Sequence, residues 1–442
     1  MIKAIRAIRE KYFDNTVELS KLSKTFLLWG IGLILVYLSN VLLIRWIGLK
    51  HYGEYAVFMN WVTLGSTLVT FGWDGFLVQQ IPLLHFNLEG KRAAGSLLRK
   101  ALLTFFILYM VLIGILITTK YVFILPFFLD DKGFLIIFLL LVFLFTGISL
   151  FKSMLKIFHT VSPVQWMEDF GKPLLMLIVF GCFYYFKTIP ELISVYEVNL
   201  LLFLGLLSGL VYLAVKKFRK TISWKDKTAP PENWMRKCFY FMCVMLGYSF
   251  FSRMELLFLG YYGKNEDAGR YQLLLRIADL VILPDFLFNY YLPQKFSHLF
   301  AEKDLAGAAI LFRNAARTVF YLQVICLAGV SALGYLYLKS FNISGTELLL
   351  FLVVLSSAQL FYSFFGSTNL VLMTSGNEKY SFIALGIVIV FESLANMLWI
   401  PAYGVKAAVY ISWGSVLVYT FILYYFVQKR LHFSSPFLKR AV

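Results

Sequence analysis

The chain has 442 residues and a net charge of +17; 60% of its residues are hydrophobic and only 15% are charged. A soluble domain carries about 25% charged residues, so this composition excludes an ordinary soluble enzyme. The apolar residues are gathered into segments of about 20, the length that an α-helix needs to cross a bilayer. The chain is therefore predicted to be an integral membrane protein.

A charged, amphipathic stretch over residues 1–25 precedes the first apolar segment. That segment is too long for a signal peptide and lacks a small-residue cleavage site, so we expect it to be retained as the first membrane span. Eleven more apolar segments follow, which predicts an all-α, polytopic protein of about 12 transmembrane helices. The expected spans are 26–47, 55–81, 101–119, 133–158, 163–186, 192–215, 238–260, 270–292, 317–338, 346–372, 380–400 and 404–427.

Lysine and arginine are divided unevenly between the two sides of the membrane that these spans define. The side of the two termini carries 30 of the 41 cations, and the opposite loops carry 9. Because positively charged loops stay in the cytoplasm, both termini are predicted to be cytoplasmic. Membrane insertion and contact with anionic lipids account for the basic charge, so no nucleic-acid partner is expected.

The spans are expected to form two related six-helix lobes, over residues 26–216 and 238–427. A charged linker over 217–237, which contains two adjacent prolines, is expected to join the lobes on the cytoplasmic side, and a cytoplasmic tail over 428–442 to follow them. An even number of helices in each lobe keeps both copies in one orientation, related by an axis along the membrane normal.

Local sequence similarity supports this internal repeat. In each lobe a Gly-x-Tyr sequence opens the second helix of the set, at Gly53 and at Gly269. Further on, each lobe has a Pro and a His that lead into an amphipathic cytoplasmic segment, at Pro82 and His85 and at Pro293 and His298.

Several stretches place glycines and aromatic residues at turns: RWIGLKHYGEYAVF from Arg45, FLGYYGKNEDAGRYQLLLRIADL from Phe258, and MTSGNEKYSFIALG with NMLWIPAYGVKAA from Met373 and Asn396. These stretches resemble the polysaccharide-transporter branch of the multidrug/oligosaccharidyl-lipid/polysaccharide exporter superfamily, the Wzx-type flippases of O-antigen, capsule or exopolysaccharide repeat units. The resemblance implies two pseudo-symmetric lobes as in MATE and MurJ transporters, in the bacterial inner membrane. Lys406 departs from the pattern, because related sequences usually have a small residue there.

The function that the resemblance implies is translocation of undecaprenyl-diphosphate-linked oligosaccharide by alternating access, with a polymerase and glycosyltransferases of the same pathway as partners. One alternative is a drug or small-cation exporter of the same superfamily, whose cavity would be acidic or apolar. Another is a membrane-embedded glycan polymerase, ligase or acyltransferase, which would need a large external loop or a His/Asp constellation, whereas the outer loops here are short. We expect no catalytic residue, no metal site and no cofactor beyond a coupling ion, H⁺ or Na⁺.

Arg253 and Arg276 are the remaining two of the 41 cations, placed inside helices and counted to neither side of the membrane. Ionisable groups inside a bilayer are costly and mark functional sites by default. At 1.5 Å per residue, both lie roughly 9–12 Å below the outer surface. Two guanidinium groups there are expected to bind a diphosphate in bidentate fashion. The alternative is that each arginine is already neutralised, Arg276 by Asp279 one turn later and Arg253 by the nearby Glu255.

The best isolated acids near the middle of the membrane are Asp74, in a Gly-Trp-Asp-Gly kink, and Glu392, with Asn396 one turn later. Either is expected to bind the coupling ion or, alternatively, to make a structural hydrogen bond to opened backbone. Asp279 is a third candidate for ion coupling, and Asp285 carries the same ambiguity.

A basic cluster is expected at the inner end of the fourth and fifth helices. Lys152 and Lys156 lie on one face, and Lys172 follows Glu168 and Asp169 by one helical turn. One hypothesis is an inner vestibule that captures the lipid diphosphate. The other is snorkelling lysines with an intrahelical salt bridge.

Overall fold

The computed structural model describes residues 16–80, 88–120, 132–157, 164, 166–186, 192–221, 233–339, 346–435 and 437. All regular elements in these ranges are helices, and none of the ranges contains a strand. Eight single helices are long and apolar enough to cross a membrane, and α9 with α10 adds a ninth span when the bent pair is counted together. The prediction of an all-α membrane protein is confirmed.

The remaining expected spans coincide with helices that are merged or interrupted. The first two spans form one element, α2 (Thr16–Thr70), whose backbone is non-helical at Gly48, with φ 81°. The fifth and eighth spans are each split into shorter helices: the π-helix η2 (Trp166–Gly171) and α7 (Lys172–Tyr185), and α11 (Asn265–Ala278), the 3-10 helix η3 (Asp279–Ile282) and α12 (Leu283–Ala301).

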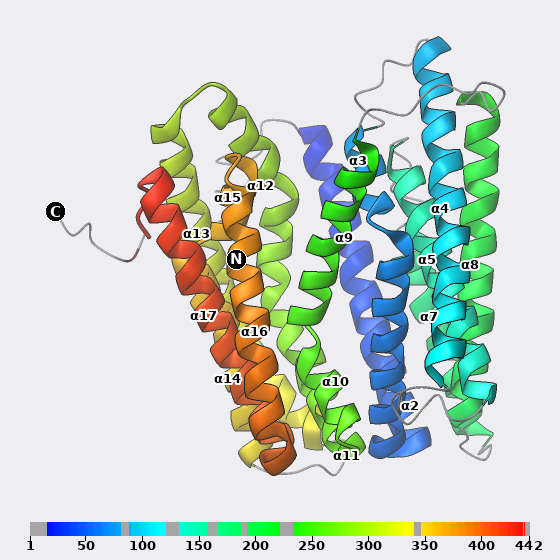
Figure 1. Cartoon of the computed structure of the whole chain (residues 1–442). Coiled ribbons are helices and arrows are strands. Elements are labelled where there is room, and N and C mark those ends of the chain that lie inside the picture. The colour runs from blue at the N-terminus through cyan, green and yellow to red at the C-terminus, as the bar shows by residue number, and fades with distance from the viewer. Residues whose placement is uncertain are drawn as a thin grey trace. The chain divides into compact units, whose positions relative to one another are not determined.

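The helices group into two compact units. The first comprises Met1–Gly48 and Val62–Cys243. Within it, α5 packs against both α3 and α8, and α7 also contacts α8 (Figure 1). Besides α7, η2 and parts of α2 and α9, its helices are α3 (Trp73–Gln80), α4 (Leu88–Lys120), α5 (Lys132–Ile157) and α8 (Leu192–Thr221).

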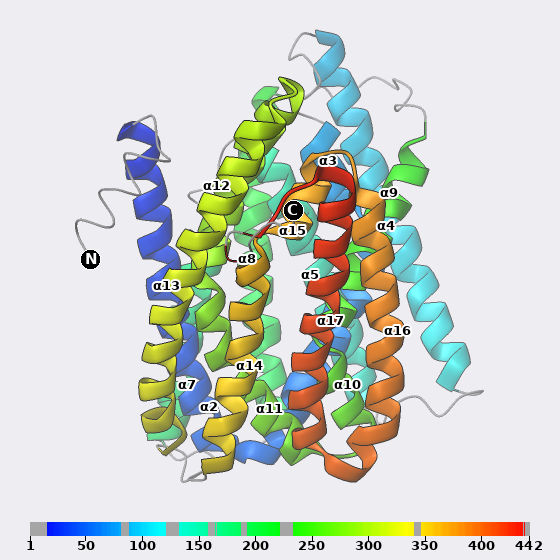
Figure 2. The same ribbon diagram turned by 90° about the vertical axis from the view of Figure 1, so that its left-hand side faces the viewer.

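The second unit comprises Leu49–Trp61 and Val244–Val442. Figure 2 shows α17 between α14 and α16, which agrees with the packing of α17 against both. Besides α11, η3 and α12, its helices are the end of α9 (Trp234–Phe251), α10 (Met254–Tyr261), α13 (Leu305–Lys339), α14 (Thr346–Phe365), α15 (Thr368–Thr374), α16 (Glu378–Tyr403) and α17 (Val405–Leu431).

Residues 49–61 belong to the second unit because the two Gly-x-Tyr sequences pack against each other. A side chain at Gly53 would collide with the backbone carbonyl of Asn265, and one at Gly269 would collide with the carbonyl of Leu49. Asn265 Nδ2 also donates a hydrogen bond of 3.0 Å to Glu54 Oε1. The expected lobe boundaries stay predictions, and Pro82 and His85 lie outside the described residues.

Large apolar side chains are exposed along the long helices. Met110 of α4 is 63% exposed, Leu201 of α8 70%, Ile325 of α13 67% and Leu398 of α16 70%. A soluble protein would bury such residues, whereas a helix in lipid satisfies its backbone internally and leaves apolar side chains on the outside. These faces are therefore lipid-facing, and the chain is a membrane protein.

Candidate functional site

Arg253 lies at a break in the seventh expected span. Helices α9 and α10 meet there at an angle of 63°, and Arg253 is the residue directly before α10, with φ −146° and ψ 8°. Its Nη1 donates a hydrogen bond of 2.6 Å to Oδ1 of the buried Asn60 on α2. The helix break thus places a half-buried guanidinium inside the second unit.

Arg276 lies at a second break, in the last turn of α11 before the 3-10 helix η3. Its guanidinium contacts the buried hydroxyl of Tyr52, and its Nε has no hydrogen-bond partner among the described residues. Arg276 and Asp279 are both close enough to Arg253 for direct electrostatic interaction. The structure therefore brings the two predicted arginines together with one acid, leaving a net positive cluster.

Asp279 is the first residue of η3 and its side chain is exposed. It interacts with both arginines, so the structure places it where it reduces the repulsion between them. Glu255, by contrast, does not neutralise Arg253 as the sequence suggested. Its side chain lies beside Glu392 in the same unit instead.

Glu255 of α10 and Glu392 of α16 are both 1% exposed, and their carboxyl groups lie within hydrogen-bonding reach of each other. Tyr271 and Ser412 also approach Glu255. Neither oxygen of Glu392 receives a hydrogen bond from a donor among the described residues. Two carboxylates side by side in an apolar interior cannot both be ionised without compensation, so this pair requires a proton or a cation.

Asn396, one turn after Glu392 on α16, is fully buried, and neither end of its amide has a hydrogen-bond partner in the described ranges. Its carbonyl oxygen is the kind of neutral ligand that accompanies carboxylates around a hard cation. The sequence singled out Glu392 and Asn396 but missed Glu255 as their partner. Glutamate in the apolar sequence MELLFLGY was the available signal.

Asp74 accepts a local hydrogen bond and one from a neighbouring helix. Its Oδ1 accepts from the Gly75 backbone N–H at 2.9 Å, and its Oδ2 accepts from Ser149 Oγ at 3.4 Å. It stands in the first turn of α3, a helix that begins directly after Phe71 and Gly72, which have positive φ. This geometry matches the structural alternative, and ion coupling at Asp74 stays a prediction.

The basic residues of α5 and α7 have different neighbours in the structure. Lys152 Nζ lies 2.5 Å from Glu168 Oε2, while the Lys172 ammonium sits 4.0 Å above the ring centre of Phe203. The backbone of Lys156 lies in α5, but its side chain, like that of Asp169, is outside what the structure describes. Binding of a lipid diphosphate by these lysines stays a prediction.

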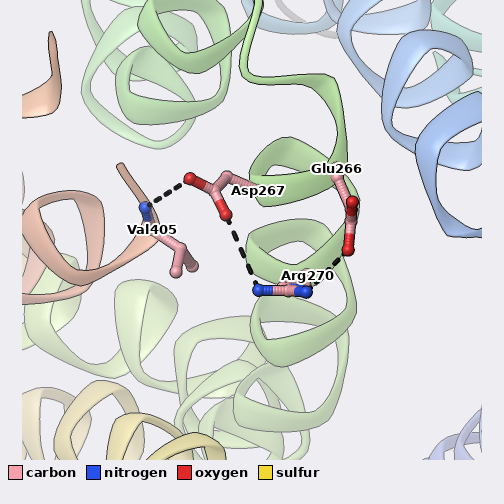
Figure 3. A network of polar contacts seen from close by, with 4 residues as sticks. All are labelled: Glu266, Asp267, Arg270 and Val405. Carbon is pink, nitrogen blue, oxygen red and sulfur yellow. Dashed lines mark hydrogen bonds and ion pairs between the residues drawn. The ribbon is translucent and has the colours of Figure 1, made fainter. Parts of the chain in front are cut away.

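A polar network fixes the end of the second unit at which α11 begins. Asp267 Oδ2 accepts a hydrogen bond of 3.3 Å from the Val405 backbone N–H, and Arg270 contacts Asp267 Oδ1 at 3.9 Å and Glu266 Oε1 at 2.6 Å (Figure 3). The network ties the first turn of α11 to the α16–α17 hairpin. It therefore holds the helices that carry Arg276 and Glu392 together.

This arrangement of long and interrupted apolar helices defines a polytopic membrane protein, and solved structures share the fold. An inward-facing multidrug resistance MATE family transporter of the MOP superfamily matches with a TM-score of 0.70 and 13% identity, over 90% of this chain and 94% of that one. Lipid II flippase MurJ in an inward closed conformation matches with a TM-score of 0.64 and 12% identity, over 91% and 87%. A MOP superfamily transporter from Pyrococcus furiosus gives 0.64 and 13%, over 93% and 95%.

The profile of the family described as "Polysaccharide biosynthesis protein" matches residues 20–292. The chain belongs to this family, and it shares its fold with transporters of the MOP superfamily. The resemblance seen in the sequence is confirmed. No curated relative matches the chain.

Proposed function

We propose that the protein is a flippase that moves an undecaprenyl-diphosphate-linked oligosaccharide from the inner to the outer leaflet of a bacterial inner membrane. It would supply repeat units for a surface polysaccharide, with both termini in the cytoplasm and by alternating access of the two lobes. The observation that carries this proposal is the neighbouring pair Arg253 and Arg276, held at two helix breaks.

The chemistry of the pair suits a diphosphate. Each guanidinium offers a planar fork of N–H donors to two phosphate oxygens, and such charge-assisted hydrogen bonds are about twice as strong as neutral ones. Asn60 holds Arg253 at 2.6 Å and Tyr52 contacts Arg276, so both donors are positioned before a ligand arrives. No bond of the substrate needs to break.

Two comparisons support a lipid-linked glycan. The family that matches the chain is described by polysaccharide biosynthesis, and one of the proteins that shares the fold is a flippase of lipid II. The multidrug transporter with the same fold keeps an exporter of small molecules as the second candidate. A drug cation would be repelled by a net positive cluster, which favours the flippase.

Glu255 and Glu392 are proposed to couple transport to an ion gradient. A ligand can shift a conformational equilibrium only by binding one state better than the other. A proton or Na⁺ held between these two carboxyls in one state, with Asn396 beside Glu392, would provide that difference in affinity.

Replacement of the arginines tests the proposal. Arg253→Ala and Arg276→Ala are expected to abolish surface polysaccharide in a strain that depends on this gene, with protein levels close to normal. Removing a hydrogen bond to a charged group costs about 1.5–3 kcal/mol, so binding of a lipid diphosphate to the purified protein should weaken by about ten- to about hundredfold. Lysine at either position keeps the charge without the fork and should rescue only in part.

Two readouts separate the outcomes. Unchanged export and unchanged diphosphate binding in both alanine variants would contradict the proposal. Weakened binding of an aromatic cation, with no response to the diphosphate, would favour the small-molecule exporter instead.

A further inference from the structure

An open groove with a volume of about 340 Å³ runs between α16 and α17. Its floor is made by small residues, Ala395 (4% exposed), Ala407 (7% exposed) and Gly414, and its sides by exposed aromatic residues such as Trp399 and Tyr403. On α16 the lining residues recur every four positions from Phe391 to Tyr403, so they share one face of the helix.

The groove has about the length of one lipid chain. Tyr403 follows Phe391 by twelve positions, which corresponds to about 18 Å along the helix axis. One leaflet of hydrocarbon is about 15 Å thick. The groove therefore runs through most of a single leaflet, on two helices that are long and apolar enough to span the membrane.

One end of the groove is cationic. Lys406 lines it at the α16–α17 hairpin and is exposed. Among the described residues it has no hydrogen bond or ion pair. Trp399 and Tyr403 stand on the neighbouring helix at the same end, and Trp and Tyr favour the level of the lipid headgroups. An apolar channel that ends in an unpaired ammonium beside such rings complements an anionic amphiphile.

We propose that this groove is a binding site for an anionic phospholipid, with the headgroup phosphate on Lys406 and one acyl chain along the floor. A zwitterionic lipid offers the same chain, but its own ammonium competes for the phosphate. The inference does not depend on what the protein transports.

Lipid retention tests the site directly. The purified protein is reconstituted in nanodiscs of phosphatidylcholine and phosphatidylglycerol, released, and weighed with its bound lipids by native mass spectrometry. The wild type is expected to retain phosphatidylglycerol in preference to phosphatidylcholine. A cation close to anionic lipid contributes about 1 kcal/mol, so Lys406→Ala should reduce that preference by about fivefold, Lys406→Arg should keep it, and Lys406→Glu should reverse it.

Two glycines of α16 and α17 provide a matched pair of filling variants. A Cβ added at Gly414 or at Gly386 meets no atom within 4 Å, but only Gly414 lines the groove. Gly414→Leu should lose retained lipid of both kinds, whereas Gly386→Leu should behave as the wild type. Glycerol phosphate, which carries the headgroup anion without chains, should not compete.

Three results would overturn the site. One is an unchanged preference for phosphatidylglycerol in Lys406→Ala, and another is full competition by glycerol phosphate. The third is a dimer of the wild type that Gly414→Leu dissociates, because the groove would then be covered by a second copy of the chain. None of these experiments measures transport, so a negative result for the lipid site would not contradict the flippase proposal, which has a separate test.

Discussion

Asn60 decides where the guanidinium of Arg253 points. Its side chain is 2% exposed; Nδ2 donates to the Ala56 carbonyl at 3.0 Å, and this leaves Oδ1 free to accept from Arg253 at 2.6 Å. A buried amide with both ends engaged holds one orientation. Arg253 therefore keeps a fixed direction although it stands at a break where the helix backbone offers no regular support.

Asn60→Ala should accordingly destabilise the second unit. The lost hydrogen bond involves a charged donor, which corresponds to about 1.5–3 kcal/mol, and the unfolding midpoint of the purified protein in detergent should fall. Asn60→Asp keeps the acceptor for Arg253 but loses the donor to the Ala56 carbonyl, so its midpoint should fall less than that of Asn60→Ala. Equal midpoints for Asn60→Ala and the wild type would show that this contact contributes nothing.

Glu255→Gln and Glu392→Gln test the buried carboxyl pair. Each variant keeps the shape of the side chain but removes one of the two acids, so the pair no longer needs a shared proton or cation. Uptake of a fluorescent lipid-linked glycan into liposomes should continue but lose its dependence on a proton or Na⁺ gradient.

Asp74→Asn tests the remaining prediction of ion coupling at Asp74, whose carboxylate already receives hydrogen bonds from Gly75 and Ser149. If those hydrogen bonds are its whole role, the variant keeps the dependence on the gradient, and loss of that dependence would place coupling at Asp74. A response to the gradient that survives in both glutamine variants would place the coupling ion elsewhere.

At the scale of elements, the close approach of α2 and α11 depends on two glycines. Gly53 lies against the Asn265 carbonyl and Gly269 against the Leu49 carbonyl, so neither position has room for a Cβ. Because the obstructing atoms are backbone, they cannot move aside as a side chain would. The two helices that carry Asn60 and Arg276 are thereby held at a separation that only glycine permits.

Gly53→Ala and Gly269→Ala should each lower the unfolding midpoint, because overpacking typically costs about 1–3 kcal/mol. Gly329→Ala on α13 is the control: a Cβ there meets nothing within 4 Å, and alanine is favoured over glycine within a helix by about 1 kcal/mol. Its midpoint should not fall. If all three variants unfolded alike, the close approach would carry no energetic weight.

The helix breaks also explain which site residues the sequence predicted and which it did not. The depth of Arg253 and Arg276 along continuous helices predicted that the two side chains could meet, and in the structure they interact electrostatically. The same reasoning paired Glu255 with Arg253, but a 63° bend follows Arg253, and residues two apart on a helix do not face each other. Likewise, the π-helix η2 changes the helical period over Trp166–Gly171, and Glu168 contacts Lys152 of another helix. Hydropathy reports neither kind of irregularity.

At the scale of the whole molecule, the charge distribution predicts the orientation. In a variant without the four native cysteines, a cysteine at Lys225 should resist an impermeant thiol reagent in intact cells, and one at Lys50 should react. Lys225 lies outside the described residues, whereas Lys50 is exposed. The reverse pattern would invert the topology and contradict transport from the inner to the outer leaflet.

The hairpin between α16 and α17 has a consequence for how the chain enters the membrane. Helix α16 ends at Tyr403 and α17 begins at Val405, so Gly404 alone connects them. Because the connection is one residue long, one helix cannot cross the bilayer while the other stays on the side from which they insert. We expect the two helices to leave the insertion machinery together as a preformed pair. Lys406, the single charged residue near the tip of this hairpin, would cross the bilayer with them.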